Sequence, residues 1–478
     1  MNYIIIRYIL ARILEVLGLF LLLPFLVGLC YRERQMWAYL LVAAGCLLLG
    51  ELIKLKKPKS RVFYAREGFV AVALSWILIG MVGAIPFVLT KEIPSYLNAV
   101  FETISGFTTT GGTILSDVEV LAKCTQFWRL FTHWMGGVGV LVLLLAVLPL
   151  SGSYNMHLMR AESTGPDVGK LVPKVKNTAR ILYMIYIGIT LIEIVALMIT
   201  GLPLYDAATL TFSTVGTGGF GLLNSSAADY STAAQSVILV FMLLCGINFG
   251  LFHLILIKKP KDALRSEELR SYLGIVAAAT VLIGFSMRDA FANLGESLFH
   301  AGFQVVSVIT TTGFTTRDFN LWTPFAKTIL FLLMAIGACA GSTGGGLKVS
   351  RLIVLIKSMG NEIAGMIHPR SVKKVHMDGR VIPEGVLRSI RVYLAIYVGI
   401  YMVSLLFVSV DGFSFETNAS AVMAMLNNIG PGFDMVGPTG NFAAFSPFSK
   451  CVLMFDMLAG RLELLPLMVL FSIKTWKK

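Results

Sequence analysis

Ten long apolar runs divide the sequence, and they constrain the fold more than any other feature. A helix that crosses a bilayer needs about 20 consecutive, mostly apolar residues. Only 14% of the 478 residues are charged, whereas soluble domains contain about a quarter. The sequence therefore predicts an all-α polytopic membrane protein and excludes an ordinary cytosolic enzyme. The runs lie near residues 3–30, 36–54, 67–90, 126–150, 178–202, 232–257, 270–288, 324–357, 386–410 and 447–474.

Four shorter, semi-apolar segments lie between several of these runs, near residues 95–110, 205–217, 295–312 and 414–429. They are too short to cross a bilayer and too apolar to be ordinary solvent loops. We interpret them as re-entrant segments, because irregular backbone is tolerated at membrane depth where it lines a protected or watery cavity.

Basic residues fall mainly on one side of this predicted topology. The chain has 40 Lys and Arg against 27 Asp and Glu, a net charge of +13. The basic residues gather in connections near 54–66, 160–180, 258–270 and 357–391, whereas the loops near 220–231 and 411–416 have none. By the positive-inside rule, both termini are cytoplasmic and all four re-entrant segments enter from outside. Exceptions on the outer side are Arg32, Arg34, Lys91 and Arg317.

The ends of the four short segments form an internal repeat. Each end lies between two predicted spanning helices, so the repeated unit is helix, pore loop, helix. Four such units around one pore give pseudo-fourfold symmetry, with two extra transmembrane helices before them in residues 1–60. We expect the repeats at 61–165, 166–262, 263–365 (with a broken helix) and 366–478. The aligned ends are Thr108-Thr109-Thr110-Gly111, Val215-Gly216-Thr217-Gly218, Thr310-Thr311-Thr312-Gly313 and Asn427-Asn428-Ile429-Gly430.

Four converging loops of this kind suit the passage of a cation. A potassium ion that enters the membrane exchanges its water shell for equivalent oxygens, which backbone carbonyls supply. Glycine permits the extended geometry, and threonine adds hydroxyl oxygens beside it. Close helix packing is the alternative explanation for a single glycine loop, but four at repeated spacing favour an ion pathway. Acidic residues near the outer starts of the short helices are expected to stabilise the helix N-termini and to attract cations; they are Glu102, Asp206, Glu296 and Glu416.

Longer motifs distributed over essentially the whole chain resemble a known family. They are FTTTGG (107–112), HWMGG (133–137), NFG (248–250), GSTGGGLK (341–348), NNIGPG (427–432) and GRLE (460–463). On these motifs the chain resembles the Trk/Ktr/HKT potassium transporter superfamily. It is most similar to the bacterial Trk-type membrane subunit, because two helices precede the first pore unit. The resemblance implies potassium uptake across the bacterial cytoplasmic (inner) membrane, with K+ as the transported ion and no enzyme activity.

The resemblance also implies a K+ selectivity filter built from the four loops. Its key glycines would be Gly111, Gly218, Gly313 and Gly430, and glycine in all four loops goes with potassium preference. One register stays open, because TVGTG at 214–218 also reads like a potassium-channel filter, which would make Gly216 the key position. The other filter residues would be Thr109, Thr110, Thr217, Thr311, Thr312, Asn428 and Ile429.

A glycine-rich string interrupts the apolar run at 324–357, and glycine clusters break helices. An irregular segment beneath the filter would obstruct the pore, and the resemblance implies an intramembrane gating loop at this place. A kink for tight packing is the alternative. The candidate gate residues are Gly341, Ser342, Thr343, Gly344, Gly345, Gly346 and Arg461.

The sequence predicts a location for each of three charged or polar side chains near these motifs. Arg461 lies within the last apolar run, where a cation is costly. The resemblance places Arg461 near gate and pore, and a salt bridge with Asp456 or Glu463 is the alternative. We expect Lys348 to extend to the cytoplasmic surface. His133 is expected to pack where an interfacial aromatic residue would.

The resemblance implies partners that the chain itself does not contain. These are a second copy in a homodimer, each protomer with its own pore, and a cytosolic ring of RCK/KTN nucleotide-binding regulatory subunits of the TrkA type. No nucleotide is expected to bind to this chain, because it has no GxGxxG motif after a strand. Two other functions stay open: a symporter that couples K+ to Na+ or H+, and, more distantly, an intramembrane enzyme, for which Ser342 has no identifiable histidine partner.

Overall fold

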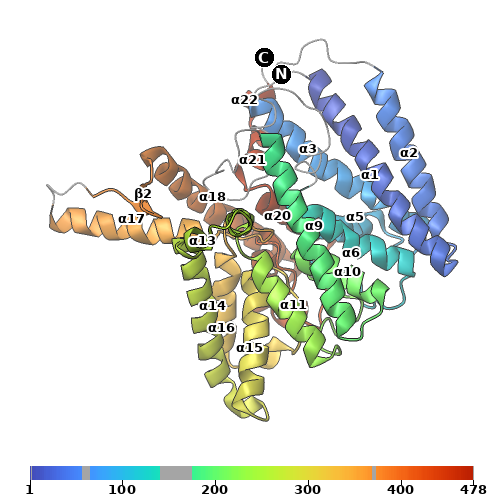
Figure 1. The fold of residues 1–478 in the computed structure, drawn as a ribbon. Helices are drawn as coiled ribbons and strands as arrows, with labels where there is room; N and C mark the ends of the chain where they lie inside the picture. Colours follow the sequence, from blue (N-terminus) through green and yellow to red (C-terminus); the bar gives the residue numbers. More distant parts are fainter. Residues whose placement is uncertain (2, 56–64, 140–174, 369–372, 477–478) are drawn as a thin grey trace.

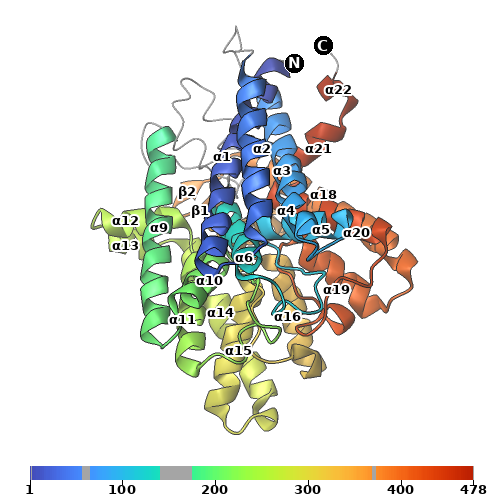
Figure 2. The same cartoon turned by 90° about the vertical axis from the view of Figure 1, so that its right-hand side faces the viewer.

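The structure is a computed structural model that describes residues 1, 3–55, 65–139, 175–368 and 373–476. Helices dominate it, and the first and the last described helices reach the same end of the molecule (Figures 1 and 2). The sheet among the described residues is one short antiparallel hairpin of β1 (His376–Met377) and β2 (Arg380–Val381). The all-α prediction is therefore confirmed.

The first two helices form an antiparallel pair beside the first repeat. They are α1 (Tyr3–Tyr31) and α2 (Met36–Lys54), which pack along their length. Near the cytoplasmic end predicted from the sequence, the ammonium of Lys54 pairs with Glu15 at 2.7 Å. At the other end, the carboxylate of Glu33 accepts hydrogen bonds from the backbone N–H groups of Lys123 (2.7 Å) and Cys124 (2.9 Å). The pair is thus bonded to the start of the helix Lys123–Val138, which belongs to the first repeat.

The first repeat contains α3 (Ala65–Gly83), α4 (Ile85–Leu89), the short helix α5 (Tyr96–Phe107) and α6 (Lys123–Val138). Residues 140–150 of the predicted run at 126–150 lie outside the described residues.

The second repeat contains α9 (Val175–Ile199), the short helix α10 (Leu204–Val215), α11 (Thr232–Cys245), α12 (Phe249–Leu256) and α13 (Pro260–Leu264). The prediction of one helix over 232–257 was wrong, because α12 turns away from α11 by 92°. The side chain of Asn248 caps the new helix by accepting a hydrogen bond from the N–H of Gly250 at 2.8 Å.

The third repeat contains α14 (Glu267–Ser286), the 3-10 turn η1 (Arg288–Ala290), the short helix α15 (Leu294–Ile309) and η2 (Phe319–Leu321). Its last part is the predicted broken helix, divided into α16 (Pro324–Ile336) and α17 (Val349–Ile367). The twelve residues between these two helices have an irregular backbone, so the break is confirmed.

The fourth repeat begins with α18 (Glu384–Val408), η3 (Ser409–Asp411), the short helix α19 (Phe415–Leu426) and η4 (Asp434–Val436). It ends with α20 (Pro447–Arg461), α21 (Leu465–Phe471) and α22 (Ile473–Trp476). The predicted run at 447–474 is therefore interrupted too. Glu463 and Leu464 have left-handed φ angles of 58° and 56° at the interruption.

Six of the described helices are long and apolar enough to cross a membrane, and the bent pair α11–α12 makes up to seven. The difference from the ten predicted runs arises because three runs are bent or broken and a fourth is only partly described. By contrast, all four predicted re-entrant segments are short helices of 12 to 16 residues.

The four repeats follow one another around a common centre (Figure 1). Helix α6 packs on α10, α11 on α15, α16 on α19 and α20 on α5, so the fourth repeat closes on the first. Every residue from 99 to 107 and from 417 to 426 is buried. The short helices α5 and α19 are thus enclosed by protein, as the pseudo-fourfold arrangement requires.

Candidate selectivity filter and gate

Each short helix leads into the same backbone turn. The second residue after the helix has a left-handed φ, and a glycine with positive φ follows two residues later. The first set comprises Thr109 (56°), Thr217 (54°), Thr311 (55°) and Asn428 (56°). The second comprises Gly111 (81°), Gly219 (78°), Gly313 (86°) and Gly430 (97°).

One backbone hydrogen bond repeats in all four loops and fixes their alignment. The N–H of the residue before each key glycine donates to a carbonyl in the last turn of the short helix. The pairs are Thr110 with Ser105 (2.9 Å), Gly218 with Ser213 (2.8 Å), Thr312 with Ser307 (2.9 Å) and Ile429 with Ala424 (2.9 Å).

The predicted register of the second loop was therefore wrong by one residue. Gly219, rather than Gly218 or Gly216, takes the position of Gly111. Gly218 corresponds to Thr110, and Gly216 corresponds to Thr108 at the helix end. Three glycines among four residues left the register undefined, because each of them tolerates a positive φ. A neighbouring signal was overlooked: the pair Gly219-Phe220 matches Gly313-Phe314, and both phenylalanines are buried.

The four key glycines form a closed ring with the carbonyl oxygens of the preceding residues. A Cβ atom on Gly111 would overlap the oxygen of Gly218, and one on Gly219 would overlap that of Thr312. Likewise, a Cβ on Gly313 would overlap the oxygen of Ile429, and one on Gly430 would lie 2.7 Å from that of Thr110. Only glycine fits at these positions, because each repeat presses a carbonyl against the glycine of the preceding repeat, and the first repeat does so against the fourth.

A cavity opens on this ring, on the side that the sequence predicts to face outward. Its lining includes all four key glycines, together with residues from the loops that follow them. The buried guanidinium of Arg129 also lines the cavity. This arrangement resembles the outer mouth of a pore that narrows to the glycine ring.

Glu102 lies elsewhere than predicted. It is in the middle of α5 instead of at its outer start, and it is 1% exposed. Its carboxylate accepts hydrogen bonds from Arg129 Nε (2.6 Å), the Thr113 hydroxyl (2.9 Å) and the N–H of Ile114 (3.0 Å). Glu102 thus holds the chain just after Gly111 and neutralises Arg129. The other three acids, Asp206, Glu296 and Glu416, do lie in the first turns of their helices.

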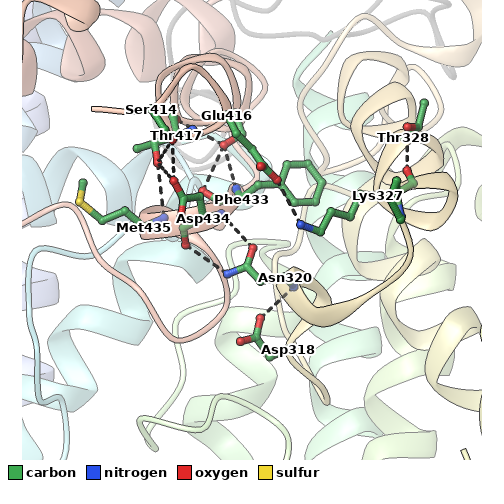
Figure 3. Close-up of polar contacts among 12 residues, drawn as sticks. Asp318, Asn320, Lys327, Thr328, Ser414, Glu416, Thr417, Phe433, Asp434 and Met435 are labelled. Atoms are coloured by element: carbon green, nitrogen blue, oxygen red, sulfur yellow. Dashed lines mark hydrogen bonds and ion pairs between the residues drawn. The ribbon is translucent and has the colours of Figure 1, made fainter. Parts of the chain in front are cut away.

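The chain after the fourth loop is fastened to the third repeat (Figure 3). The hydroxyls of Ser414 and Thr417 donate to Asp434 Oδ2 at 2.5 and 2.7 Å. Asn320 donates to the carbonyl of Asp434 (3.1 Å) and accepts from its N–H (2.9 Å). We call these four residues the outer clasp. The hydrogen bonds from Ser414 and Thr417 lower the pKa of the Asp434 carboxyl.

The irregular segment between α16 and α17 lies directly against the inner side of the filter. The N–H of Gly345 donates to the hydroxyl of Thr311 at 2.7 Å. A Cβ on Gly344 would lie 2.8 Å from the carbonyl oxygen of Thr310, and one on Gly345 would overlap that of Asn427. The glycines therefore let the segment approach the C-terminal ends of α15 and α19 closely.

Arg461 joins the filter to this segment. Its Nη1 donates to the Thr343 carbonyl (2.8 Å) and to the Thr109 hydroxyl (3.3 Å). Its Nη2 donates to the carbonyls of Gly137 (2.7 Å) and Gly136. The guanidinium is thus buried between the first filter loop, the irregular segment and the end of α6.

Lys348 does not extend to the cytoplasmic surface, so that prediction was wrong. The residue is 1% exposed, and its ammonium donates to the carbonyl of Gly344. The broken helix leaves carbonyls without intrahelical partners, and the lysine binds one of them instead of reaching water.

Two further contacts of the irregular segment could not be found from the sequence. The carboxylate of Glu268 on α14 accepts hydrogen bonds from the N–H groups of Ala340 (2.7 Å) and Ser350 (3.1 Å), and so holds both ends of the segment. The segment also bonds to the bend between α11 and α12. The N–H of Phe249 donates to the Gly341 carbonyl (3.0 Å), and that of Cys339 donates to the Gly246 carbonyl (3.1 Å).

Comparison with known proteins places this geometry in a family. The model of the TrkH family, described as cation transport protein, matches residues 39–288 and 289–477. The chain is 36% identical over 468 residues to the Trk system potassium uptake protein TrkH of Salmonella typhimurium, covering 96% of each chain. It is 33% identical over 485 residues to the protein of that name from Halomonas elongata, covering 98% of this chain and 100% of the relative. The crystal structure of the potassium transporter TrkH from Vibrio parahaemolyticus matches with a TM-score of 0.90 at 30% identity, over 100% of both chains.

Proposed function

The chain belongs to the TrkH family of cation transport proteins, and from this premise we propose that it is the pore-forming subunit of a potassium uptake system in the bacterial cytoplasmic membrane. The observation that carries the proposal is the closed ring of Gly111, Gly219, Gly313 and Gly430 at the base of the cavity on the predicted outer side. Relatives of nearly full coverage that are named as potassium uptake proteins support the choice of ion.

The filter would replace the water shell of K+ with oxygens from four equivalent chain segments. One layer consists of the carbonyls of Thr110, Gly218, Thr312 and Ile429, which alternate with the ring glycines. The next layer towards the gate consists of Thr109, Thr217, Thr311 and Asn428. A fourfold set of backbone oxygens suits a large monovalent cation, and glycine at every key position keeps the passage free of side chains.

The segment with residues 341–346 would act as the gate. It lies against the inner ends of α15 and α19, where helix dipoles place negative charge that favours a cation. Arg461 and Lys348 bring their positive charges to the same place. The protein's own cations therefore occupy the region that a permeating K+ needs, and conduction requires the segment and these side chains to move aside.

The assembly that we propose is a homodimer, with one pore in each protomer, controlled by a cytosolic ring of RCK/KTN nucleotide-binding subunits. The names of the relatives, which refer to a Trk system, support the presence of further components. Both termini and the basic connections would face the cytoplasm. The regulatory ring would dock on the basic connections near 151–179 and 358–385, of which residues 151–174 and 369–372 lie outside the described residues.

The test is ion flux through the purified full-length chain in liposomes. With a K+ gradient, we expect a current whose reversal potential follows the K+ gradient alone, with Na+ carried poorly. The chain should also restore growth of a potassium-uptake-deficient bacterium at low external K+.

Empty liposomes are the control. If the reversal potential depends in a fixed ratio on the Na+ or H+ gradient, the protein is a coupled symporter and the proposal of a channel-like pore is wrong. Absence of any K+ flux from correctly folded protein, together with failed complementation, would overturn the proposed function.

A further inference from the structure

The second filter loop lacks side chains that support the first and third loops from behind. In the first loop, the hydroxyls of Thr108 and Thr110 are hydrogen-bonded to each other at 2.7 Å. In the third loop, Thr310 and Thr312 form the same pair at 2.8 Å. The equivalent positions of the second loop are Gly216 and Gly218. This loop therefore has no side chain of its own where its counterparts have a threonine pair.

The imidazole of His133 fills the vacated space. A Cβ atom on Gly218 would overlap three atoms of the imidazole ring, and one on Gly216 would lie 2.5 Å from the carbonyl oxygen of His133. His133 belongs to α6, in the preceding repeat, and is 0% exposed. His133 does pack, as expected, but against Gly218 and Phe220 directly behind the filter loop instead of at an interfacial position.

Contacts on both sides of Gly218 hold the imidazole in place. His133 Nδ1 is 2.9 Å from the hydroxyl of Ser213, whose carbonyl accepts the hydrogen bond from the N–H of Gly218. The imidazole also stacks on Phe220, with 4.2 Å between the ring centres and 19° between the ring planes. The same Phe220 ring contacts the guanidinium of Arg129 at 3.5 Å. The histidine is thus fixed to the helix before the filter and to the chain after it.

The end of α6 is built to bring His133 this close. A Cβ on Gly136 would overlap the carbonyl oxygen of Phe107, and one on Gly137 would lie 2.8 Å from the Cα of Gly216. Arg461 binds the carbonyls of both these α6 glycines. In the HWMGG motif, His133 therefore fills the space behind the second loop, and the two glycines allow α6 to contact the filter loops closely.

We propose that His133 is a positioning residue for ion selectivity, which replaces the missing threonine pair of the second loop and holds the Gly218 carbonyl beside Gly111. This proposal rests on the proposed transport function. The Gly218 oxygen is one of four in the same layer, so a shift of this carbonyl alone makes the layer uneven. An uneven layer fits K+ less well and discriminates less against the smaller Na+.

A double-mutant cycle at His133 and Gly218 tests this complementarity. His133→Ala leaves a cavity behind the strand, and Gly218→Thr forces a side chain into the imidazole. Gly218 has no left-handed φ, so threonine is compatible with its backbone. We expect each single variant to lower the K+/Na+ permeability ratio in liposomes by roughly tenfold, a size typical of coupled neighbours. The double variant, in which threonine occupies the space of the lost imidazole, should recover most of the ratio.

The matched control is His300→Ala. His300 is also a buried histidine beside a filter loop, bonded to the Thr316 hydroxyl at 2.9 Å and stacked on Phe291. It lies in α15, nearer the outer end, and its variant should keep the permeability ratio. Each ratio is measured on protein that elutes as a single species with a retained thermal transition, so misfolding is separated from loss of selectivity.

Two results would overturn the proposal: an unchanged ratio in folded His133→Ala, or a double variant no more selective than Gly218→Thr. If His133→Ala does not fold, His133→Asn keeps a partner for Ser213 and fills part of the space. An Asn variant with an unchanged ratio contradicts the proposal equally. Absence of K+ flux in the unmodified chain would instead refute the proposed function, so the two failures are distinguishable.

Discussion

At the scale of single residues, one backbone angle decides which glycine completes the filter ring. The second loop offers Gly216, Gly218 and Gly219, yet only Gly219 has a positive φ and abuts the neighbouring carbonyl of Thr312. In the first, third and fourth loops, the nine filter residues proposed from the sequence occupy matching positions in the turn. The sequence did not predict the register of the second loop, because glycine identity carries no information about φ.

The ring makes Gly219 intolerant of any side chain. We expect Gly219→Ala to abolish K+-selective flux in liposomes, because the methyl group overlaps the Thr312 oxygen and the left-handed φ costs about 1 kcal/mol for alanine. Gly188→Ala in α9 is the control, since the added methyl group has no neighbour within 4 Å apart from the surrounding backbone of its own helix. It should conduct normally. Selective currents of normal size through Gly219→Ala would mean that Gly219 does not belong to the ring.

Charged residues were the least predictable at this scale. Lys348 and Glu102 were expected at aqueous ends, and both lie inside, bound to groups that the fold brings from distant segments. Lys348 finds a carbonyl released by a broken helix, and Glu102 finds Arg129 on another helix. Such partners depend on the completed tertiary structure, so periodicity and hydropathy along the chain cannot reveal them.

At the scale of elements, breaks in apolar helices are what distinguish the structure from a simple bundle. The break at Gly341–Gly346 was predictable from the sequence, because repeated glycine is incompatible with a stable helix. The bend at 246–248 has one glycine, and the interruption at 462–464 has none. At the first of these points the carbonyl of Gly246 accepts a hydrogen bond from the N–H of Cys339, and at the second the side chain of Glu463 pairs with Arg351 on α17. Tertiary contacts override local helix preference at these points.

The irregular segment between α16 and α17, which we propose to be the gate, should become more mobile when Ala340 and Ser350 lose their common acceptor. Glu268→Ala removes the carboxylate that accepts from Ala340 and Ser350, leaving N–H groups whose burial costs about 1–3 kcal/mol each. We expect a higher basal K+ flux in liposomes without any regulatory subunit. Glu268→Gln keeps one acceptor oxygen and should change the flux much less.

The neighbouring residue provides a control for this experiment. Glu267 pairs with Lys357 near the surface, where ion pairs contribute about 0–1 kcal/mol. Glu267→Gln should leave basal flux unchanged. If Glu268→Ala folds and conducts no more than the unmodified chain, the ends of the segment do not control opening.

At the scale of the whole molecule, the sequence predicted the pseudo-fourfold plan, and the closed order of helix contacts agrees with it. What the sequence could not give is how the repeats are joined. The joints are long-range contacts, such as the ring itself and the hydrogen bonds between Asn320 and Asp434 in the outer clasp. No local pattern encodes such pairs: Asn320 and Asp434 lie 114 residues apart, and the ring contact between Gly430 and Thr110 joins the two ends of the chain of repeats.

The outer clasp should make stability depend on pH. The folded state lowers the pKa of Asp434 below its ordinary value of 3.8, so the ionised carboxylate stabilises the fold. This contribution is present above the unfolded pKa and is lost as the pH falls through the folded pKa. We expect Asp434→Asn to have a lower Tm than the unmodified chain near neutral pH, with the difference shrinking as the pH falls below 3.8 and disappearing once the pH is below the lowered pKa of the folded state.

A partial variant checks the cause of this pH dependence. Ser414→Ala removes one of the two hydroxyl donors and should give a smaller Tm difference of the same sign. A Tm difference for Asp434→Asn that stays constant from neutral to acidic pH would show that ionisation of Asp434 does not support the clasp.

The two backbone bonds between the irregular segment and the bend of α11–α12 have a mechanical consequence. Gly341 and Cys339 are hydrogen-bonded to the bend between α11 and α12, where α12 turns 92° away from α11. The irregular segment cannot move away from the filter loops without either breaking both hydrogen bonds or changing the angle between α11 and α12. A displacement of α12, or of α13 packed against it, therefore reaches the irregular segment through backbone hydrogen bonds, without passing through any flexible side chain.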